Sequence, residues 1–394
     1  MPESPAVFAI EGVPRYYAWG SPTTIPALLG QPADGRPVAE LWFGAHPHDP
    51  SPALGTTLDA VIAADPTGLL GAGVVGRWGP RLPFLVKILA ADVPLSIQVH
   101  PNLAQARAGF AAEDAAGIRA DAPERNYRDA NHKPELLCAL TEFEALCGFR
   151  PVTATLRLLD ALALPDLEPV RTGLAGPGGL CAAFTYLLSL ADPVPLATSV
   201  ALAAPGLPTE FAGAARAVEL ATAEFPGDVG VVVSLLLNYV RLAPGQAIFL
   251  AAGNVHAYLR GTGVEVMASS DNVLRCGLTP KHVDVDELLS VTDFTELPDP
   301  VVAIEQLDAA TWRYPAPVAD FEVRRVELGA DTRDEQRGGG PTVVLAVGSA
   351  SVSADGVVVD LAPGRAAMVR PAATWALSGS GTAVLVTATV GDPG

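Results

Sequence analysis

The residue types that could do chemistry in this chain gather around two histidines that lie far apart in the sequence, His100 and His256. His100 closes the segment SIQVH, in which the alternation of a strand would place the side chain of Gln98 on the same face. Glu135, in the segment NHKPE, lies between the two histidines in the sequence. Imidazole nitrogen suits zinc, and carboxylate and amide oxygens can complete such a set. These four residues therefore predict a catalytic site for zinc or a similar divalent ion, with one coordination position left open.

Short apolar runs separated by Gly and Pro predict the strands that must hold these ligands. In the first part of the chain these runs are 82–90, 94–99, 136–140 and 145–149. A polar stretch with helical texture, 103–120, interrupts them. Strand texture returns at 246–251 and 263–267, on either side of His256. The ligands should therefore meet in one β core that is assembled from two parts of the chain.

The segment between these two parts has a different texture, rich in Ala and Leu with helical spacing, and we interpret it as a helical insertion. After about residue 301, β-prone runs alternate with turns, which predicts a second, smaller β barrel without histidine. We therefore expect a mainly β fold with a helical insertion. Its expected parts are a catalytic domain formed by 1–150 and 227–300, the insertion 151–226, and a C-terminal β domain, 301–394.

Length and composition indicate a folded, acidic protein. The chain has 394 residues, of which 49% are hydrophobic, and a net charge of -18. Such a charge repels nucleic acid and anionic membrane surfaces, so neither is an expected partner. The segment 1–11 carries Glu3 and no basic residues, which argues against a secretory signal, and runs such as 229–237 are too short to span a membrane. A cytoplasmic monomer is expected.

The other histidines and the cysteines have simpler interpretations. His46 and His48 lie in a Pro-rich segment that predicts a solvated loop, and a loop would equally suit His282. The cysteines show no C-x-x-C spacing, and a large intracellular chain does not need disulfides. Buried reduced thiols are therefore expected at Cys138, Cys147, Cys181 and Cys276.

The polar segment 271–281 follows a predicted strand and has two interpretations. Taken alone, it could be a surface loop in which Asp271 or Asn272 caps a helix. Alternatively, Arg275 and Lys281 supply positive charge for a phosphate or an enediolate in a chain that is otherwise strongly negative. The residues by themselves leave both interpretations open.

Six segments, in their order along the chain, resemble the signature of type I mannose-6-phosphate isomerases. They are YAWG (17–20), AELWFGAHP (39–47), QVHPN (98–102), NHKPE (131–135), GNVHAYL (253–259) and DNVLRCGLTPK (271–281). The resemblance covers about residues 8–150 and 245–290 closely, whereas the other regions match in texture and position. It implies a cupin-type β barrel (jelly roll) with an inserted helical domain and a second cupin-like domain at the C-terminus.

The resemblance also implies roles for individual residues. One zinc ion per chain would be held by Gln98, His100, Glu135 and His256. The catalytic arginine of the family falls on Arg275. The substrate pocket points to Trp19, Ser96, Lys133, Tyr258, Glu265 and Lys281. His132 and Asp271 also match motif positions, and we carry them as candidates for proton transfer.

The implied substrate is a small phosphosugar, and the implied reaction interconverts mannose 6-phosphate and fructose 6-phosphate through a cis-enediol. A divalent ion would polarise the sugar carbonyl, and Arg275 could share the developing negative charge. The proton carrier stays open between Lys133, His132 and Asp271. The alternative is a cupin that only binds sugar, or a metal-dependent dioxygenase. Arg275, Lys133 and Lys281 favour an anionic sugar and thus the isomerase.

Overall fold

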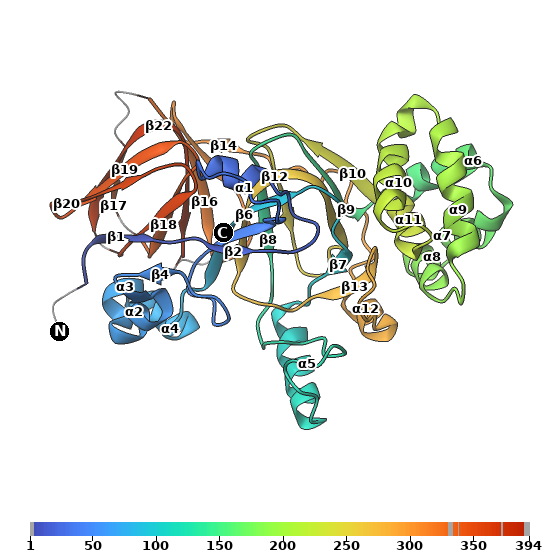
Figure 1. Cartoon of the computed structure of the whole chain (residues 1–394). Helices are drawn as coiled ribbons and strands as arrows, with labels where there is room; N and C mark the ends of the chain where they lie inside the picture. Colours follow the sequence, from blue (N-terminus) through green and yellow to red (C-terminus); the bar gives the residue numbers. More distant parts are fainter. Residues whose placement is uncertain (1–3, 330–333, 338, 372, 390–394) are drawn as a thin grey trace.

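The fold combines two antiparallel sheets with several groups of helices (Figure 1). This computed structural model describes residues 4–329, 334–337, 339–371 and 373–389. Helix accounts for 30% and strand for 31% of the chain. The expectation of a mainly β chain is therefore wrong in its proportions. Besides the predicted helical segment, the stretch 58–78 folds into three short helices. Its Gly and Pro residues interrupt the helical pattern in the sequence, so these helices were not predicted.

A 10-stranded sheet carries the predicted metal ligands. Its strands follow the order β10-β9-β12-β6-β3-β2, and β7, β8, β11 and β13 pair beside this path. The bounds are β2 (Val13–Arg15), β3 (Glu40–Phe43), β6 (Phe84–Ala91), β7 (Ile97–Val99), β8 (Glu135–Ala139), β9 (Phe143–Phe149), β10 (Leu237–Leu242), β11 (Ala247–Leu250), β12 (His256–Ala268) and β13 (Leu274–Gly277). Strands from before and after the helical segment thus share one sheet.

Strand β12 joins the two halves of this sheet. Its first half, from His256, pairs with β9, and its second half, from Gly261, pairs with β6 and β8. The bend at Gly261 has a φ of +127°, and a Cβ there would lie 2.6 Å from the carbonyl oxygen of Glu142. Only glycine fits this close approach. The bend lets one strand bring both His256 and Glu265 to the same region of the molecule.

A 12-stranded sheet forms the other end of the molecule, with the order β14-β15-β16-β22-β18-β21-β1-β4-β5 and with β17, β19 and β20 beside it (Figure 1). The bounds are β1 (Val7–Ile10), β4 (Pro52–Ala53), β5 (Thr56–Thr57), β14 (Glu305–Gln306), β15 (Thr311–Tyr314), β16 (Glu322–Leu328), β17 (Asp334–Arg337), β18 (Thr342–Ala346), β19 (Ser349–Ala354), β20 (Val357–Leu361), β21 (Arg365–Val369) and β22 (Thr374–Thr387). Strand β1 pairs with β21, with Val7 opposite Val369. Strand β1 therefore belongs to the same sheet as the strands β14 to β22 from the last part of the chain.

The helices lie at the margins of the sheets (Figure 1). Their bounds are α1 (Thr24–Leu28), α2 (Leu58–Ala64), α3 (Pro66–Leu70), α4 (Ala72–Trp78), α5 (Leu103–Ala115), α6 (Val152–Leu162), η1 (Pro165–Leu167), α7 (Glu168–Ala175), α8 (Gly179–Leu188), α9 (Val194–Ala203), η2 (Ala204–Gly206), η3 (Thr209–Phe211), α10 (Ala212–Glu224), α11 (Val229–Val233), η4 (Ser234–Leu236) and α12 (Val285–Val291). The inserted run continues to Leu236, past the expected end at 226. Its apolar core includes Ile97, Val99 and Leu274 of β7 and β13, so the insertion supports the strands beside the site.

Two further expectations concern cysteines and membrane spans. Cys138, Cys147 and Cys276 are buried free thiols, as expected, whereas Cys181 is exposed on α8. The expectation of a buried thiol is wrong at Cys181 because it lies on the outer face of an amphipathic helix. Among the described residues, none of the helices has the length and apolar character that crossing a bilayer requires.

Candidate active site

Three of the four predicted metal ligands meet in the structure. His100 follows β7, Glu135 begins β8, and His256 begins β12. One ligand atom from each lies within 4.8 Å of the others, and all three side chains are buried. Glu135 Oε1 lies 3.3 Å from His100 Nε2, and Glu135 Oε2 lies 3.4 Å from His256 Nε2. The sequence thus identified side chains that three separate strands bring together.

The hydrogen bonds of the two histidines fit a metal ion. His100 Nδ1 lies 2.7 Å from the carbonyl oxygen of Asn272, and His256 Nδ1 lies 2.9 Å from that of Asn254. Because a carbonyl only accepts, each Nδ1 must carry the ring proton, which leaves the Nε2 lone pair free. Both Nε2 atoms are buried without a hydrogen-bond partner among the described residues. Buried polar atoms rarely lack a partner, and a zinc ion between them would supply one.

The charges around this group keep its donor atoms ready for a cation. Burial, and next to it the charge of Lys133, lowers the pKa of His100 to about 4, so its imidazole is neutral near pH 7. Burial alone would raise the pKa of Glu135, but Lys133 and His100 hold it well below its usual value. The site therefore presents a neutral imidazole at His100 and an ionised carboxylate at Glu135, the forms that bind a metal.

Gln98, the fourth predicted ligand, lies at the centre of the short strand β7. It is opposite His256 in β12 and opposite Arg275 in β13. Its neighbours Ile97 and Val99 are fully buried on the other face, as the alternation predicted. The side chain of Gln98 lines the same cavity as Glu135, beside the His/Glu/His group.

A cavity of about 670 Å³ lies next to the predicted metal ligands. This size suits a small ligand. Most of the residues predicted for substrate and catalysis line it, namely Trp19, Ser96, Lys133, Tyr258, Glu265, Asp271, Arg275 and Lys281. Glu224 and Phe225, which end helix α10, also contribute to its wall. The second interpretation of the segment 271–281, as part of a binding site, is the one that this geometry supports.

Positive charge gathers in this cavity. The Nζ of Lys133 lies 2.9 Å from Glu135 Oε1. Burial lowers the pKa of Arg275, and the nearby charge of Arg128 lowers it further. The pKa of Lys281 is lowered by burial and then by Arg275 and Arg128. Arg275, Lys281 and Arg128 repel one another, and an anion bound between them would relieve this repulsion.

A buried polar network on the same wall was not predicted from the sequence. Lys87, in β6, lies opposite Glu265 and opposite Trp42 in the adjacent strands. Its Nζ lies 2.8 Å from Glu265 Oε2 and 3.4 Å from Glu40 Oε1. Trp42 Nε1 donates to Glu40, and the hydroxyl of Tyr258 donates to Glu265. All five residues line the cavity.

The neighbouring carboxyl groups keep Lys87 charged. Burial alone would lower the pKa of Lys87, but Glu265 and Glu40 raise it above its usual value. Lys87 is therefore a permanent cation that holds both carboxylates in place. A signal existed in the sequence, since Lys87 is the one charged residue of the apolar run 82–90. A lone charge on a buried strand requires partners, which lie on other strands far away in the sequence.

The structure does not bring His132 to the cavity. Its Nε2 lies 3.1 Å from both carboxylate oxygens of Asp320, a buried residue just before β16. His132 is also not among the residues that line the cavity. Its contact connects the loop before β8 to the other sheet, which indicates a structural role.

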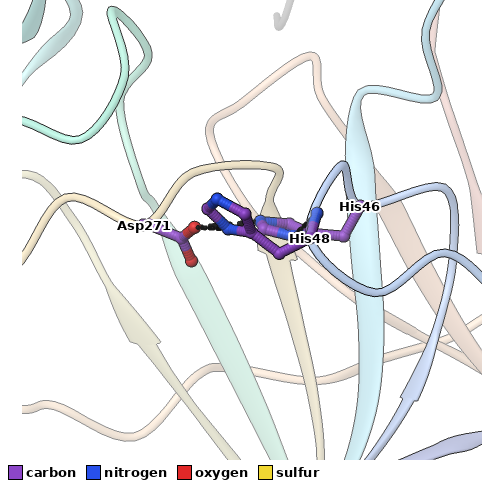
Figure 2. A group of neighbouring side chains, drawn as sticks. All are labelled: His46, His48 and Asp271. Atoms are coloured by element: carbon purple, nitrogen blue, oxygen red, sulfur yellow. Dashed lines mark hydrogen bonds and ion pairs between the residues drawn. The ribbon is translucent and has the colours of Figure 1, made fainter. Parts of the chain in front are cut away.

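The two histidines expected in a solvated loop are brought close to Asp271 (Figure 2). His48 is largely exposed, as expected. His46 is buried, because its ring packs edge-on against Trp42 at a centroid distance of 5.0 Å. The loop interpretation is therefore wrong for the burial of His46. His282 is exposed.

Comparison with known proteins agrees with this geometry. A family model described as phosphomannose isomerase type I, catalytic domain, matches residues 7–152. The mannose-6-phosphate isomerase of Escherichia coli (strain K12) is 38% identical over 368 residues, which are 90% of this chain and 92% of that protein. The enzyme of Rattus norvegicus is 33% identical over 388 residues, or 89% of this chain and 87% of its own length.

A solved structure extends the likeness to the fold. The mannose 6-phosphate isomerase of Salmonella typhimurium, bound to its substrate f6p and zinc, has a TM-score of 0.90 and 35% identity, covering 98% of this chain and 100% of that chain. Similarity of this degree over nearly the whole length leaves no large region unmatched. The chain belongs to the family of type I mannose-6-phosphate isomerases.

Proposed function

We propose that this protein is a zinc-dependent aldose–ketose isomerase that interconverts mannose 6-phosphate and fructose 6-phosphate through a cis-enediol. One observation carries the proposal. The buried His100/Glu135/His256 group adjoins, through Glu135, a cavity that is lined by Lys133 and Arg275. A metal site, a group able to move a proton and a fixed positive charge are what this reaction requires.

Gln98, His100, Glu135 and His256 would hold the ion, one per chain. When bound, zinc supplies a Lewis acid that polarises the sugar carbonyl and stabilises the negative charge of the enediolate. The protein supplies the rest. The backbone carbonyls of Asn272 and Asn254 orient the two imidazoles, and the short strand β7 presents Gln98 beside them.

Lys133 is our candidate for the group that moves the proton between C2 and C1. It lines the cavity, and its Nζ lies 2.9 Å from the ligand Glu135, so it would lie beside a sugar held at the metal. Asp271, on the same cavity wall, is the alternative. His132 is not proposed for this role, because it faces Asp320.

Arg275 is our candidate for stabilising the enediolate. It lies opposite Gln98 in the strand pairing, and it lines the cavity without a salt-bridge partner among the described residues. A guanidinium that is free of carboxylates can direct its full charge to the substrate.

Ser96 and Lys281 are our candidates for the phosphate contacts, since both line the cavity and neither is needed for the metal. A chain with a net charge of -18 must provide local positive charge to bind a phosphosugar. Trp19, Tyr258 and Glu265 complete the wall. We propose that they shape the pocket for the sugar ring and its hydroxyl groups.

The alternatives have less support. A module that only binds sugar has no use for a lysine beside the metal ligands. A dioxygenase has no use for a cluster of cations that suits a phosphate. Arg275, Lys281 and Lys133 on one cavity wall favour the isomerase over both.

We further propose the finer description of the fold. The 10-stranded sheet would be a cupin-type barrel formed by 1–150 and 227–300, with the helical domain 151–226 inserted and with a second cupin-like domain, 301–394. The antiparallel pairing and the bent strand β12 support this description. A monomer and a cytoplasmic location stay predictions, and light scattering would test the first.

The direct test is to incubate the zinc-loaded protein with fructose 6-phosphate and to look for mannose 6-phosphate by a coupled assay. The expected result is conversion to an equilibrium mixture of the two sugars, with no consumption of oxygen. Binding of the sugar without conversion would favour the binding module, and oxygen uptake would favour the dioxygenase.

A further inference from the structure

A second group of potential metal ligands consists of His46, His48 and Asp271 (Figure 2), and Asp271 also lines the substrate cavity. His48 Nδ1 lies 2.9 Å and His46 Nε2 lies 3.5 Å from the same oxygen of Asp271, Oδ2. One ligand atom of each residue lies within 4.8 Å of the others. In a tetrahedral zinc site with bonds of about 2.0–2.2 Å, neighbouring donor atoms are separated by roughly 3 to 3.5 Å. The three side chains are therefore close to the spacing that such an ion needs.

The backbone holds these three side chains in place. The N–H of Asp49 donates to the carbonyl oxygen of His46 at 3.1 Å, which closes a turn that carries His46 and His48 on the same side of the loop. The side chain of Asp49 forms an ion pair with Arg15. On the other side of the group, the N–H of Asp271 donates to Asp129 Oδ2 at 2.8 Å. The group thus consists of two fixed loop segments rather than freely moving surface chains.

We propose that His46, His48 and Asp271 form a second divalent-ion site, distinct from the His100/Glu135/His256 group. Two imidazole nitrogens and one carboxylate oxygen select zinc or a similar transition ion over magnesium or calcium. His46 is 4% exposed and Asp271 is 30% exposed, whereas the side chain of His48 is 72% exposed. Water can therefore fill the remaining coordination positions from the solvent side.

The protonation state of His46 permits it to bind an ion near neutral pH. Burial lowers the pKa of His46, so its ring is neutral and able to bind a metal. One rearrangement is needed. The N–H of His48 lies 3.4 Å from His46 Nδ1, and a ring bound to an ion through Nε2 must carry its proton on Nδ1. Binding of the ion at Nε2 therefore costs this long, weak hydrogen bond.

The second site should bind more weakly than the first. The group offers three protein ligands, one of them exposed, whereas the three residues of the His100/Glu135/His256 group are all buried and Gln98 lies beside them. The positive charges of Lys87 and Lys133 lie close enough to His46 to lower its pKa, and they would also repel a metal ion bound there. The buried His100/Glu135/His256 site should therefore fill first, and the His46/His48/Asp271 site should fill only when zinc is in excess.

The test counts zinc ions per chain after equilibrium dialysis against a zinc-buffered solution, by plasma mass spectrometry. Wild type should bind one more ion in excess zinc than after exchange into zinc-free buffer. His48→Ala should bind one ion fewer in excess zinc, and its turnover at limiting zinc should stay unchanged, because His48 does not line the cavity. Glu135→Ala should lose the tight ion and keep the weak one.

The matched control is His282→Ala, which removes an exposed histidine outside the group and should retain both ions. The site is supported if His48→Ala loses the weak ion and His282→Ala keeps it. Equal zinc content in wild type and His48→Ala, or loss of the weak ion in His282→Ala as well, would overturn it. The count does not depend on isomerase activity, so its failure is separate from a failure of the proposed function.

Discussion

Arg275 carries a positive charge that the fold keeps partly out of water. Burial and Arg128 lower its pKa, which means that the surroundings oppose the charge in the absence of an anion. Such a charge becomes favourable when negative charge develops beside it. In the proposed reaction this happens in the enediolate, so Arg275 should stabilise the transition state more than the bound sugar.

Arg275→Ala is therefore expected to lower kcat by on the order of 10²-fold with a small change in KM. Arg275→Lys should rescue little, since an ammonium lacks the planar fork of a guanidinium. Steady-state kinetics with mannose 6-phosphate measures both values. Arg107→Ala, which removes an exposed arginine of helix α5, should behave like wild type. An increase in KM alone would assign Arg275 to phosphate binding.

Lys281 gives a prediction about substrate recognition. If it contacts the phosphate through a charge-assisted hydrogen bond worth about 1.5–3 kcal/mol, Lys281→Ala should lower kcat/KM for mannose 6-phosphate by roughly ten- to a hundredfold. The value for free mannose, which has no phosphate, should stay the same. The ratio of the two sugars within each variant serves as its own control. A preference for the phosphorylated sugar that survives in Lys281→Ala would remove this residue from the phosphate site.

The contrast between Glu135 and Lys87 shows which site residues a sequence reveals. The proposed metal ligands stand in short segments that are dense in donor side chains, so Glu135 could be found from the segment NHKPE. Lys87 depends on Glu40 and Glu265, which belong to two other strands, β3 and β12. Strand pairing over such distances in sequence cannot be read from local patterns, and therefore the network was missed.

At the scale of elements, strand β12 decides whether the site can form. It begins at His256, a proposed metal ligand, changes its pairing partner at Gly261 and carries Glu265 to the Lys87 network. A side chain at the bend would meet the backbone of Glu142 and Phe143. The bend thus links the geometry of the metal site to that of the substrate wall.

Gly261→Ala is expected to lower the free energy of unfolding by about 1–3 kcal/mol or more, because it adds a steric clash to a strained backbone conformation. Urea unfolding measures the change, and zinc content should fall with it. Gly356→Ala is the control, since Gly356 also has a positive φ but a Cβ there meets no atom within 4 Å. Equal effects of the two substitutions would contradict a special role for the bend.

Element types were easier to predict than element partners. The runs now seen as β6, β8, β9 and helix α6 were located from periodicity, which reports how one segment is buried. The predicted domain bounds put residues 7–10 in the first domain. Strand β1 nevertheless pairs with β21, which lies more than 350 residues later in the sequence, with Val7 opposite Val369. The helical run extends to Leu236, beyond the predicted boundary at 226. Its last turns are almost entirely apolar, and periodicity alone cannot distinguish such a run from a buried strand.

At the scale of the whole molecule, the two sheets are joined by polar as well as apolar contacts. One apolar cluster includes Ile10 and Met368 of one sheet and Val86 of the other. Beside it, His132 pairs with the buried Asp320. This pair connects the sheet of the active site to the C-terminal region.

His132→Ala should therefore destabilise the protein by about 1–3 kcal/mol, because a buried carboxylate loses its partner, while kcat stays near the wild-type value. Urea unfolding and steady-state kinetics measure the two effects. In the double variant with Asp320→Ala the loss of stability should be smaller than the sum of the single losses. A large fall in kcat with unchanged stability would return His132 to the candidates for proton transfer.

The central claim is that turnover depends on an ion held by Gln98, His100, Glu135 and His256. The most direct measurement follows zinc content and isomerase rate together, in wild type and in Glu135→Ala, during removal of zinc by a chelator and its return. The isomerase rate should follow the zinc content in wild type, return when zinc is returned, and be absent in Glu135→Ala at every zinc concentration. Full turnover in protein shown to be free of metal, or in Glu135→Ala without the tight ion, would show that the reaction does not depend on this site.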